Sequence, residues 1–366
     1  MPADTALRIY AGPAARRHIA KNGLQAADIG VVPAAAGGPK GLVLGPLDRF
    51  LFGEWLPGTT HPVHLVGASI GAWRMATACL RQPVAAFERL ERDYIAQHYE
   101  LPPGRKTPSA AQVSAQFARN LEDFYGGRIG EVLGHTRFRL HIVTARGRHV
   151  LRREHRLATP LGYLGAFVSN SVHRKAMGAW LERVVFSSPE AERGACALPF
   201  GTGDYPTRQV ALNETNFQAA LQASCSIPFV LQAVHDIPGA PAGAYWDGGI
   251  TDYHLHLKYD CGSGPNLVLY PHFQKAVVPG WLDKALKWRH RATPFLDHMV
   301  VLAPDPQWVQ SLPNGKLPDR TDFTRYGNDL QGRVTAWSAA TAASRQLADE
   351  FAAWLDKPDP GRVEAL

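Results

Sequence analysis

The amino-acid sequence predicts an α/β protein built around a mainly parallel central sheet. Short apolar runs alternate along the chain with longer stretches of helical spacing, which is the pattern of strand–helix–strand units. Apolar residues make up 45% of the 366 positions, enough to bury a sizeable core. The 28 prolines are scattered along the chain and argue against a helical bundle, and an aromatic content of 10% excludes a disordered chain.

Strands are expected at the short apolar runs, which have the composition of buried parallel strands. These runs are residues 29–34, 63–66, 139–145, 184–186, 209–212, 266–270 and 298–302. Helical spacing predicts helices at 39–52, 70–81, 83–99, 108–124, 161–183 (with a break possible), 217–226 and 329–355. No linker is evident. We therefore expect a single domain over residues 1–366, with a core of about 29–255 and a C-terminal extension of about 256–366 packed on it.

Composition also limits the class of protein. No apolar run reaches the roughly 18 residues of a membrane-spanning helix, and the first thirty residues lack the features of a signal peptide. The four cysteines (Cys79, Cys196, Cys225 and Cys261) form no CxxC pair, so a reduced, cytoplasmic protein is expected. The net charge of +7 favours an anionic partner, either nucleic acid or an anionic lipid surface.

The pentapeptide at 67–71, Gly-Ala-Ser-Ile-Gly, is a GxSxG element between an expected strand and an expected helix. A serine at such a turn, here Ser69, has an exposed hydroxyl, and the small residues Gly67 and Gly71 let neighbouring backbone pass close by. The N-terminus of the following helix favours negative charge that develops beside the serine. An ordinary strand-to-helix turn is the alternative interpretation.

A glycine-rich loop at 35–41, Ala-Ala-Gly-Gly-Pro-Lys-Gly, also lies between an expected strand and an expected helix. Its adjacent glycines, Gly37 and Gly38, can turn consecutive backbone N–H groups toward one point, as an oxyanion hole requires. A phosphate-binding loop fits less well, because the G-x-x-x-x-G-K-[ST] string is absent. A plain tight turn also remains open.

Downstream, Asp247 precedes Gly248 and Gly249. An aspartate before two glycines often only forms a turn. A serine nucleophile needs a base, however. Asp247 could accept the Ser69 proton directly if burial raises its pKa and the fold brings the two side chains together.

Taken together, these elements resemble the patatin-like phospholipase family. In that family a glycine-rich oxyanion loop with a basic residue is followed by GxSxG and later by an aspartate in DG[GA]. Residues 223–228, Ala-Ser-Cys-Ser-Ile-Pro, are similar to the family's A-S-x-x-x-P block, and the resemblance spans about 29–252. It implies a three-layer α/β/α fold with a serine nucleophile elbow, and a hydrolase of lipid acyl esters that uses a serine and an aspartate without histidine.

Carried over residue by residue, the resemblance implies that Ser69 is the nucleophile and Asp247 the base. Gly37 and Gly38 would be the oxyanion donors, and Lys40 takes the family's basic position. The supporting glycines would be Gly67, Gly71, Gly248 and Gly249. The sequence departs from the family's D-G-G-G-x-R-G pattern at Ala35 and Ala36, and Pro39 has no N–H to donate.

The reaction implied is a double displacement through an acyl-enzyme intermediate, with a lipid or another acyl ester as substrate. This chemistry requires no metal and no cofactor. The sequence leaves the preferred acyl chain, the head group and the oligomeric state open.

A Ser–His–Asp triad, in an esterase or thioesterase of the α/β-hydrolase kind, is the main chemical alternative. Four histidines follow Asp247 in the chain: His254, His256, His272 and His298. Polar and apolar residues alternate over 252–257, so Asp252, His254 and His256 would share one strand face. That face is a candidate metal site, although a solvated face is the simpler interpretation.

A binding protein without catalysis is the alternative from another class. A basic stretch opposed only by Glu154 contains Arg137, Arg139, Arg146, Arg148, Arg152, Arg153 and Arg156. We expect a solvated sheet face here, with lipid head groups as the next interpretation and nucleic acid as the last. No helix-turn-helix or RNA-binding signature accompanies the stretch, so no nucleic-acid partner is expected.

Two segments have a composition that suits contact with a membrane in addition to a cytoplasmic location. In 280–291, a helix would carry Trp281, Leu282, Ala285 and Trp288 on one face and Lys284, Lys287 and Arg291 mostly on the other. Residues 161–180, which include Leu161, Leu164, Val168, Val172 and Trp180, could form a lid over an acyl groove. Packing of either segment against the protein's own core is the alternative.

Overall fold

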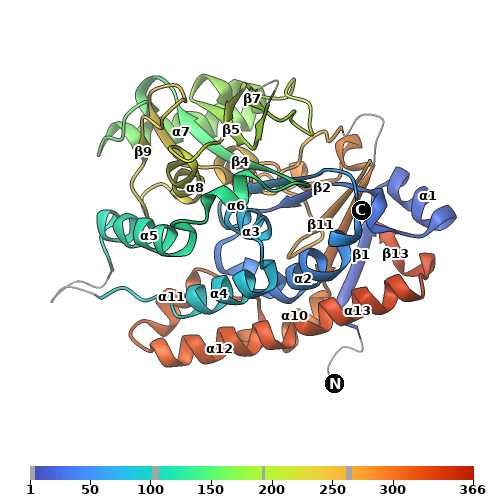
Figure 1. Cartoon of the computed structure of the whole chain (residues 1–366). Helices are drawn as coiled ribbons and strands as arrows, with labels where there is room; N and C mark the ends of the chain where they lie inside the picture. Colours follow the sequence, from blue (N-terminus) through green and yellow to red (C-terminus); the bar gives the residue numbers. More distant parts are fainter. Residues whose placement is uncertain (1–4, 101–106, 192–193, 261–265) are drawn as a thin grey trace.

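The structure is a computed structural model that describes residues 5–100, 107–191, 194–260 and 266–366 (Figure 1). Its strands are β1 (Leu7–Ala11), β2 (Ile29–Ala34), β3 (Val63–Ala68), β4 (Phe138–Gly147), β5 (Leu181–Ser187), β6 (Pro189–Glu190), β7 (Gly194–Ala195), β8 (Thr207–Ala211), β9 (Val234–His235), β10 (Ala244–Asp247), β11 (Leu267–Pro271), β12 (Met299–Pro304) and β13 (Val363–Ala365). Eleven of them form one sheet in the order β13-β1-β12-β11-β2-β3-β4-β10-β9, with β5 beside β4 and β8 beside β5.

The middle of this sheet is parallel. Strands β12, β11, β2, β3 and β4 are successive parallel neighbours, whereas β1 pairs antiparallel with β12, and β5 and β10 pair antiparallel with β4. Every residue of β2 and of β5 is buried, as expected for strands covered on both faces. The predicted α/β fold with a mainly parallel central sheet is confirmed.

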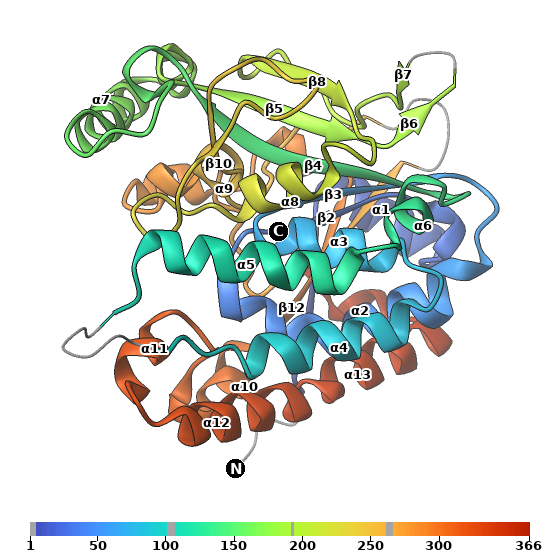
Figure 2. The same ribbon diagram turned by 60° about the vertical axis from the view of Figure 1, so that its left-hand side comes forward.

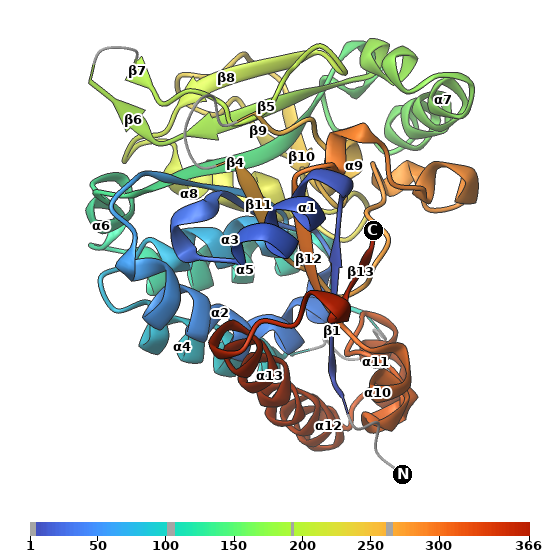
Figure 3. The same ribbon diagram turned by 90° about the vertical axis from the view of Figure 1, so that its right-hand side faces the viewer.

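The helices are α1 (Pro13–Asn22), α2 (Gly45–Phe50), α3 (Ile70–Ala78), α4 (Pro83–Ile95), α5 (Ala110–Tyr125), α6 (Ile129–Leu133), α7 (Ala158–Val172), α8 (Phe217–Cys225), α9 (Gly249–Asp252), α10 (Pro306–Ser311), α11 (Thr321–Tyr326), α12 (Leu330–Ala343) and α13 (Arg345–Asp356). Helix α3 packs on β3 and α8 packs on β4. Helices α2, α4, α12 and α13 lie beyond them on the same side of the sheet, and α7 lies on the opposite side (Figures 2 and 3). The sheet is therefore covered from both sides.

Several expected elements are shorter or more broken than the sequence suggested. The 39–52 helix is a 3₁₀-helix η2 (Gly38–Leu44), then α2, then a π-helical turn η3 (Leu51–Trp55). Glycine and proline recur through this stretch and interrupt a regular helix. The 161–183 helix breaks at His173 and continues as η6 (Arg174–Ala179) and then β5, and the terminal helix is divided between α12 and α13 at Ser344.

The segment 280–291 is not the single helix that we expected. It contains two short 3₁₀-helices, η7 (Trp281–Asp283) and η8 (Lys287–His290). The stretch 252–257 is likewise not a strand, because Asp252 ends helix α9 and the following residues form no regular element. Both places are hydrogen-bonded to other parts of the chain: the amides of Tyr253 and His254 donate to the carbonyls of Pro279 and Val278, and Asp283 accepts from Asn170.

The two ends of the chain meet in the sheet. The missed strand β1 lies between β12 and β13, so the N-terminal and C-terminal strands are neighbours (Figure 1). The C-terminal extension thus supplies β11, β12 and β13 to the central sheet. Within the described ranges, no helix is both long and apolar enough to span a bilayer. Cys79, Cys196 and Cys225 are buried free thiols, and Cys261 lies outside the described residues.

Candidate active site

Ser69 occupies a sharp turn between β3 and α3. Its backbone has φ 57° and ψ −130°, a strained conformation for a residue with a side chain. The glycines two residues before and two residues after Ser69 are required by the close packing of the turn. A methyl group at Gly67 would collide with the backbone of Ala72, and one at Gly71 would collide with the carbonyl of Ala34. The turn therefore has the backbone geometry of a nucleophile elbow.

The fold brings Asp247, the last residue of β10, to this serine. The Ser69 hydroxyl Oγ donates a hydrogen bond of 2.6 Å to Oδ2 of Asp247, and both side chains are buried. The second carboxylate oxygen, Oδ1, accepts a 2.7 Å hydrogen bond from the Gly249 amide. Gly248 has no space for a side chain, because a methyl group there would meet the carbonyl of Val143. The two residues singled out from the sequence, 178 positions apart, are in direct contact.

The segment 223–228 fastens the serine turn to the aspartate. The buried hydroxyl of Ser224 accepts a 3.0 Å hydrogen bond from the Ser69 amide and donates one of 2.7 Å to the carbonyl of Val143. The Asp247 amide donates to the carbonyl of Ser226 at 2.9 Å, and the Gly248 amide donates to the carbonyl of Ser224 at 3.2 Å. One short stretch thus fixes the positions of the two residues that carry these side chains.

The environment of Asp247 makes its carboxyl a stronger base than a solvated aspartate. Burial raises the pKa of Asp247 from the usual 3.8 to about 6. The hydrogen bond from Ser69 and the positive charge of Arg320 oppose this effect, because each stabilises the ionised carboxylate. At neutral pH the group is therefore mostly ionised and can accept a proton.

The glycine-rich loop lies at the rim of the same cavity. Ala36, Gly37 and Lys40 line it together with Ser69 and Asp247, whereas Gly38 borders a neighbouring cavity. Gly38 has φ 57°, in the left-handed region that favours glycine. Neither the Gly37 nor the Gly38 amide donates to an acceptor in the described parts of the chain. Gly37 is the better placed of the two to face a reacting group beside Ser69.

The C-terminal extension forms the opposite wall of the cavity. Trp281, Lys284 and Arg320 come from this extension and line the cavity with the serine. Its volume is about 220 Å³, below the roughly 300–1,000 Å³ of typical small-molecule sites. The cavity can therefore hold only a small group, and the remainder of a long ligand would have to extend beyond it.

Three cationic side chains surround the serine and the aspartate. Lys40 lies 5.2 Å from the centre of the Phe273 ring, and Lys284 lies 4.1 Å from the centre of the Tyr253 ring. Burial lowers the pKa of Lys284 to about 8, with further lowering by the charges of Lys40 and Arg320. Burial also lowers the pKa of Lys40. These cations favour negative charge in the cavity, either on a substrate or on a reaction intermediate.

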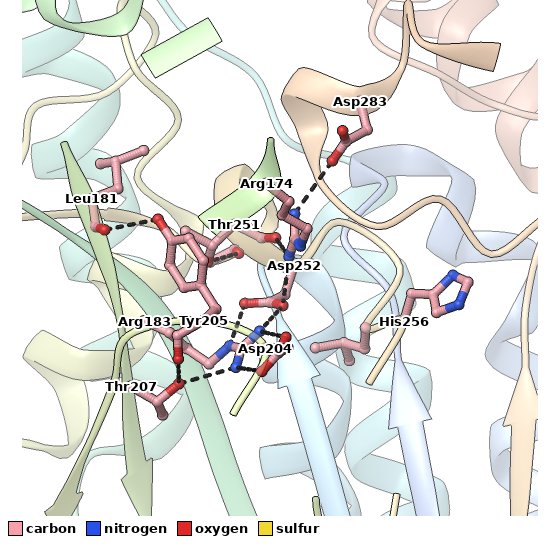
Figure 4. A network of polar contacts seen from close by, with 12 residues as sticks. Arg174, Leu181, Arg183, Asp204, Tyr205, Thr207, Thr251, Asp252, His256 and Asp283 are labelled. Carbon is pink, nitrogen blue, oxygen red and sulfur yellow. Dashed lines mark hydrogen bonds and ion pairs between the residues drawn. The ribbon is translucent and has the colours of Figure 1, made fainter. Parts of the chain in front are cut away.

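A second aspartate, Asp252, belongs to a network of polar contacts with arginines (Figure 4). Arg183 donates to both of its carboxylate oxygens, at 2.7 and 2.6 Å, and also donates to Asp204. Arg174 bridges Asp252 and Asp283 at 3.3 Å from each. Asp252 is therefore held in an ion-pair network and does not share a face with His254 and His256.

The solvated strand face that we expected for Asp252, His254 and His256, with a metal site as its alternative, is not formed, because all three side chains are buried. His254 Nδ1 lies 3.1 Å from the carbonyl of Ala276, and His256 lies between the carbonyl of Val277 and the hydroxyl of Thr293. Among the described residues, the group whose possible ligand atoms all lie within 4.8 Å of one another is His64, His141 and Cys196. There the two imidazoles are hydrogen-bonded to each other at 2.9 Å. This group contains none of the residues that line the cavity around Ser69.

The structure gives no support to a Ser–His–Asp triad. No histidine is found among the described residues that line the cavity, and the Ser69 hydroxyl donates to Asp247 directly. His254 and His272 pack against each other with ring centres 4.4 Å apart, and burial lowers the pKa of both. These histidines fill a neutral core position.

The basic stretch is largely engaged within the protein. Arg146 pairs with Glu182 at 2.6 Å and Arg153 with Asp236 at 2.7 Å. Arg139 donates to the carbonyl of His135, and Arg148 to the carbonyl of Gly178. Side chains that are bound in this way do not form a continuous free patch for a nucleic-acid backbone.

Local motifs in the sequence mark the serine, the aspartate and the glycine-rich loop that line this cavity, whereas its C-terminal wall has no such motif. Lys284 was expected on the polar face of a helix over 280–291, and Arg320 was not singled out at all. Ser224 was singled out only as part of the segment 223–228, and the sequence did not show that its hydroxyl links the Ser69 amide to the carbonyl of Val143. No local motif marks Lys284 or Arg320, because only the fold brings them to the serine.

Comparison with known proteins supplies one match. A family model described as patatin-like phospholipase matches residues 37–254, more than half of the chain. No curated protein and no solved structure matches the chain. The matched span contains the glycine pair, the serine turn and the aspartate, and it ends before Trp281, Lys284 and Arg320.

Proposed function

Because the chain belongs to the patatin-like phospholipase family, a family of lipid acyl hydrolases, we propose that Ser69 and Asp247 form its catalytic dyad. The match over residues 37–254 confirms the family resemblance that the sequence motifs indicated. The dyad would hydrolyse fatty acyl esters through a covalent acyl-enzyme. The observation that carries this proposal is the 2.6 Å hydrogen bond from the buried serine hydroxyl to the buried carboxylate.

In the first half of the reaction, Asp247 accepts the proton of the Ser69 hydroxyl while Oγ attacks the ester carbonyl carbon. A tetrahedral intermediate with a negatively charged oxygen forms. Its collapse breaks the bond to the alcohol, and Asp247 returns the proton to that leaving oxygen. The serine then carries the acyl group as an ester.

In the second half, water enters and takes the place of the alcohol. Asp247 accepts a proton from the water, which attacks the acyl carbon. The second tetrahedral intermediate releases the fatty acid and regenerates the serine hydroxyl, with the proton returned from Asp247. A raised pKa near 6 suits this role, since the group must both accept and donate a proton near neutral pH.

The oxyanion is assigned to the backbone amides of Gly37 and Gly38, with Gly37 as the primary donor. Their lack of acceptors within the described chain supports this assignment. Removing one such donor typically costs about 10²–10³ in rate. Lys40, Lys284 and Arg320 would add longer-range stabilisation of the negative charge, since all three line the cavity.

The proposal is tested by hydrolysis of p-nitrophenyl esters of graded chain length, measured with the wild-type protein, Ser69→Ala and the control Ser311→Ala. Ser311 is an exposed serine whose hydroxyl only donates to the carbonyl of Trp308. We expect Ser69→Ala to lose activity by at least about 10³-fold, and Ser311→Ala to keep it. A burst of p-nitrophenol equal to the enzyme concentration would reveal the acyl-enzyme.

Two results would overturn the proposal. One is hydrolysis by the folded Ser69→Ala variant at the wild-type rate. The other is the absence of any hydrolysis by the wild-type protein over the whole ester series, together with no reaction on phospholipid vesicles. If hydrolysis depends on Ser69, comparison of oxygen esters with thioesters of the same acyl chain defines which of the two bonds the protein prefers.

A further inference from the structure

Large apolar side chains are exposed almost entirely in one region of the molecule. In the described residues, eleven such side chains are exposed, and all but Val84 lie in residues 150–172, 229–230 or 288–295. Exposed apolar residues scattered singly over a surface need no explanation. Their concentration in one region indicates a surface that is covered when the protein acts.

Helix α7 provides the largest share of this surface, and it is oriented with its apolar side outward. Leu157, just before the helix, and Leu161, Leu164, Val168 and Val172 recur at helical spacing and are 56 to 82% exposed. We call these five side chains the α7 face. The side that packs inward contains Thr159, Gly162, Tyr163, Ala166 and Asn170. The α7 face is thus neither packed on the core nor closed over the cavity.

The buried side of α7 is held by specific polar contacts. The Asn170 amide donates to Asp283 at 2.8 Å, and the backbone amide of His155 donates to Thr159 Oγ1 at 2.8 Å. Arg289 donates both to Asn170 and to the carbonyl of Ser171. These contacts fix the rotation of the helix, so the outward direction of the α7 face is built into the fold.

Neighbouring segments extend the α7 face toward the cavity. Phe229 is 59% exposed, and its ring lies 6.0 Å from that of Tyr163, while Ile227 and Pro228 line the cavity of Ser69. On the other side, Trp281 and Lys284 line the cavity, and the exposed Trp288 follows in the same segment. Figures 2 and 3 show α7 and this C-terminal segment (orange) at the same end of the molecule.

Cationic side chains border the α7 face at both ends. Arg152 and Arg156 precede the helix, Lys175 follows it, and Lys287 and Arg291 flank Trp288; all five are exposed. No ion pair involves any of these five among the described residues. An apolar strip bordered by free positive charge matches a membrane that contains anionic lipids.

We propose that the α7 face, with Phe229 and Trp288, docks the protein on the surface of an anionic lipid membrane. Docking there places the cavity of Ser69 beside the bilayer, where one acyl ester can enter while the rest of the lipid remains in the membrane. The small cavity is consistent with this arrangement. A second copy of the chain or another protein on this surface would lie against the entrance of the cavity and block it. A membrane in the same position supplies the lipid, so the membrane is the favoured partner.

Sedimentation with vesicles tests the proposal without relying on hydrolysis. The protein is mixed with vesicles of phosphatidylcholine alone and of phosphatidylcholine with phosphatidylglycerol, both as wild type and in a Ser69→Ala background. We expect binding to the anionic vesicles. The double variant Leu161→Glu/Leu164→Glu should lower the partition coefficient at least about tenfold, and Lys175→Glu/Lys287→Glu should lower it by a similar factor on anionic vesicles only.

Val84→Glu is the matched control, since Val84 is a large exposed apolar residue outside this region, and this substitution should leave binding unchanged. Hydrolysis of a water-soluble short-chain ester should be equal in wild type and Leu161→Glu/Leu164→Glu, which separates docking from catalysis. Equal binding of the wild type and that double variant would overturn the proposal, as would failure of the wild type to bind anionic vesicles. A wild-type dimer that the double variant converts to a monomer would assign the surface to a second copy instead.

Discussion

Two aspartates, Asp247 and Asp252, lie close together in the chain and are both buried, yet their chemical environments are opposite. Asp247 accepts hydrogen bonds from a serine hydroxyl and one backbone amide, and no cation of the described residues forms an ion pair with it. Asp252 accepts two hydrogen bonds from Arg183 and one from Arg174. Burial raises the pKa of both, but the arginines at Asp252 outweigh it and hold the pKa of that carboxyl below its usual value.

This difference separates a carboxylate suited to chemistry from one suited to structure. The pKa of Asp247 rises to about 6 because its partners only partly offset burial, so it can exchange a proton near neutral pH. Asp252 stays ionised and connects β5 to the segment that follows β10. The four predictions below test that contrast, from the largest expected effect to the smallest.

Replacing Asp247 by asparagine should have the largest effect, and it should act on catalysis. The variant keeps the size of the side chain but cannot accept the Ser69 proton, so kcat/KM for a short-chain ester should fall by about 10³–10⁴. Stopped-flow or plate-based hydrolysis at pH 8 measures it. The exposed Asp236, which pairs with Arg153, supplies the control Asp236→Asn, for which activity should be unchanged.

Replacing Asp252 by asparagine should instead act on stability. It leaves the buried Arg183 with only Asp204 as a charged partner, and breaking a buried pair typically costs about 3–5 kcal/mol. Urea unfolding should show this loss, while the folded variant retains kcat within a few-fold. An Asp252→Asn protein that is as stable as the wild type would refute the structural role.

Asp247→Asn should also make the protein more stable at neutral pH. The pKa of about 6 exceeds the usual 3.8, so the folded state binds this proton more tightly than the unfolded state does, and ionisation at pH 7 costs about 3 kcal/mol. The variant avoids that cost and should gain about 2 kcal/mol at pH 7. The gain should shrink as the pH falls below 6 and vanish below about pH 3, where the carboxyl is protonated in both the folded and the unfolded state. Urea unfolding across this pH range measures it, and a variant that is less stable at pH 7 would contradict the prediction.

The smallest effect concerns Lys284. Its charge lowers the pKa of Asp247, so Lys284→Met should move the midpoint of the pH–kcat/KM profile upward by a fraction of a pH unit. Lys287→Met, three residues further along on the exposed surface, should leave the midpoint in place. A downward shift in Lys284→Met would show that the lysine does not act on the aspartate through its charge.

The parts of the fold that sequence predicted well are those determined locally. Strand β2 was expected at 29–34 and is found at Ile29–Ala34, because its buried run follows Asp28 and the glycine pair Gly37–Gly38 comes shortly after it. The turn at Ser69 was equally clear, since its glycines are required by the packing of adjacent segments. Features of this kind can be recognised from the residues of the segment itself.

The remaining features depend on distant partners. Strand β1 was missed because it is stabilised by pairing with β12 and β13, at the other end of the chain. Residues 252–257 alternate like a strand, yet Asp252 is drawn into an ion pair with Arg183. The spacing of Leu161 and Val168 indicated an amphipathic helix, but periodicity alone does not say whether an apolar side faces the core or the solvent.

The central claim, that Ser69 is a nucleophile activated by Asp247, is tested most directly by a fluorophosphonate probe followed by peptide mass spectrometry across a range of pH. The account predicts one adduct, on the peptide that contains Ser69. Its rate of formation should rise about tenfold per pH unit below 6, level off above it, and fall sharply in Asp247→Asn. An adduct on another residue, or labelling of Ser69 at the same rate in Asp247→Asn, would contradict the account.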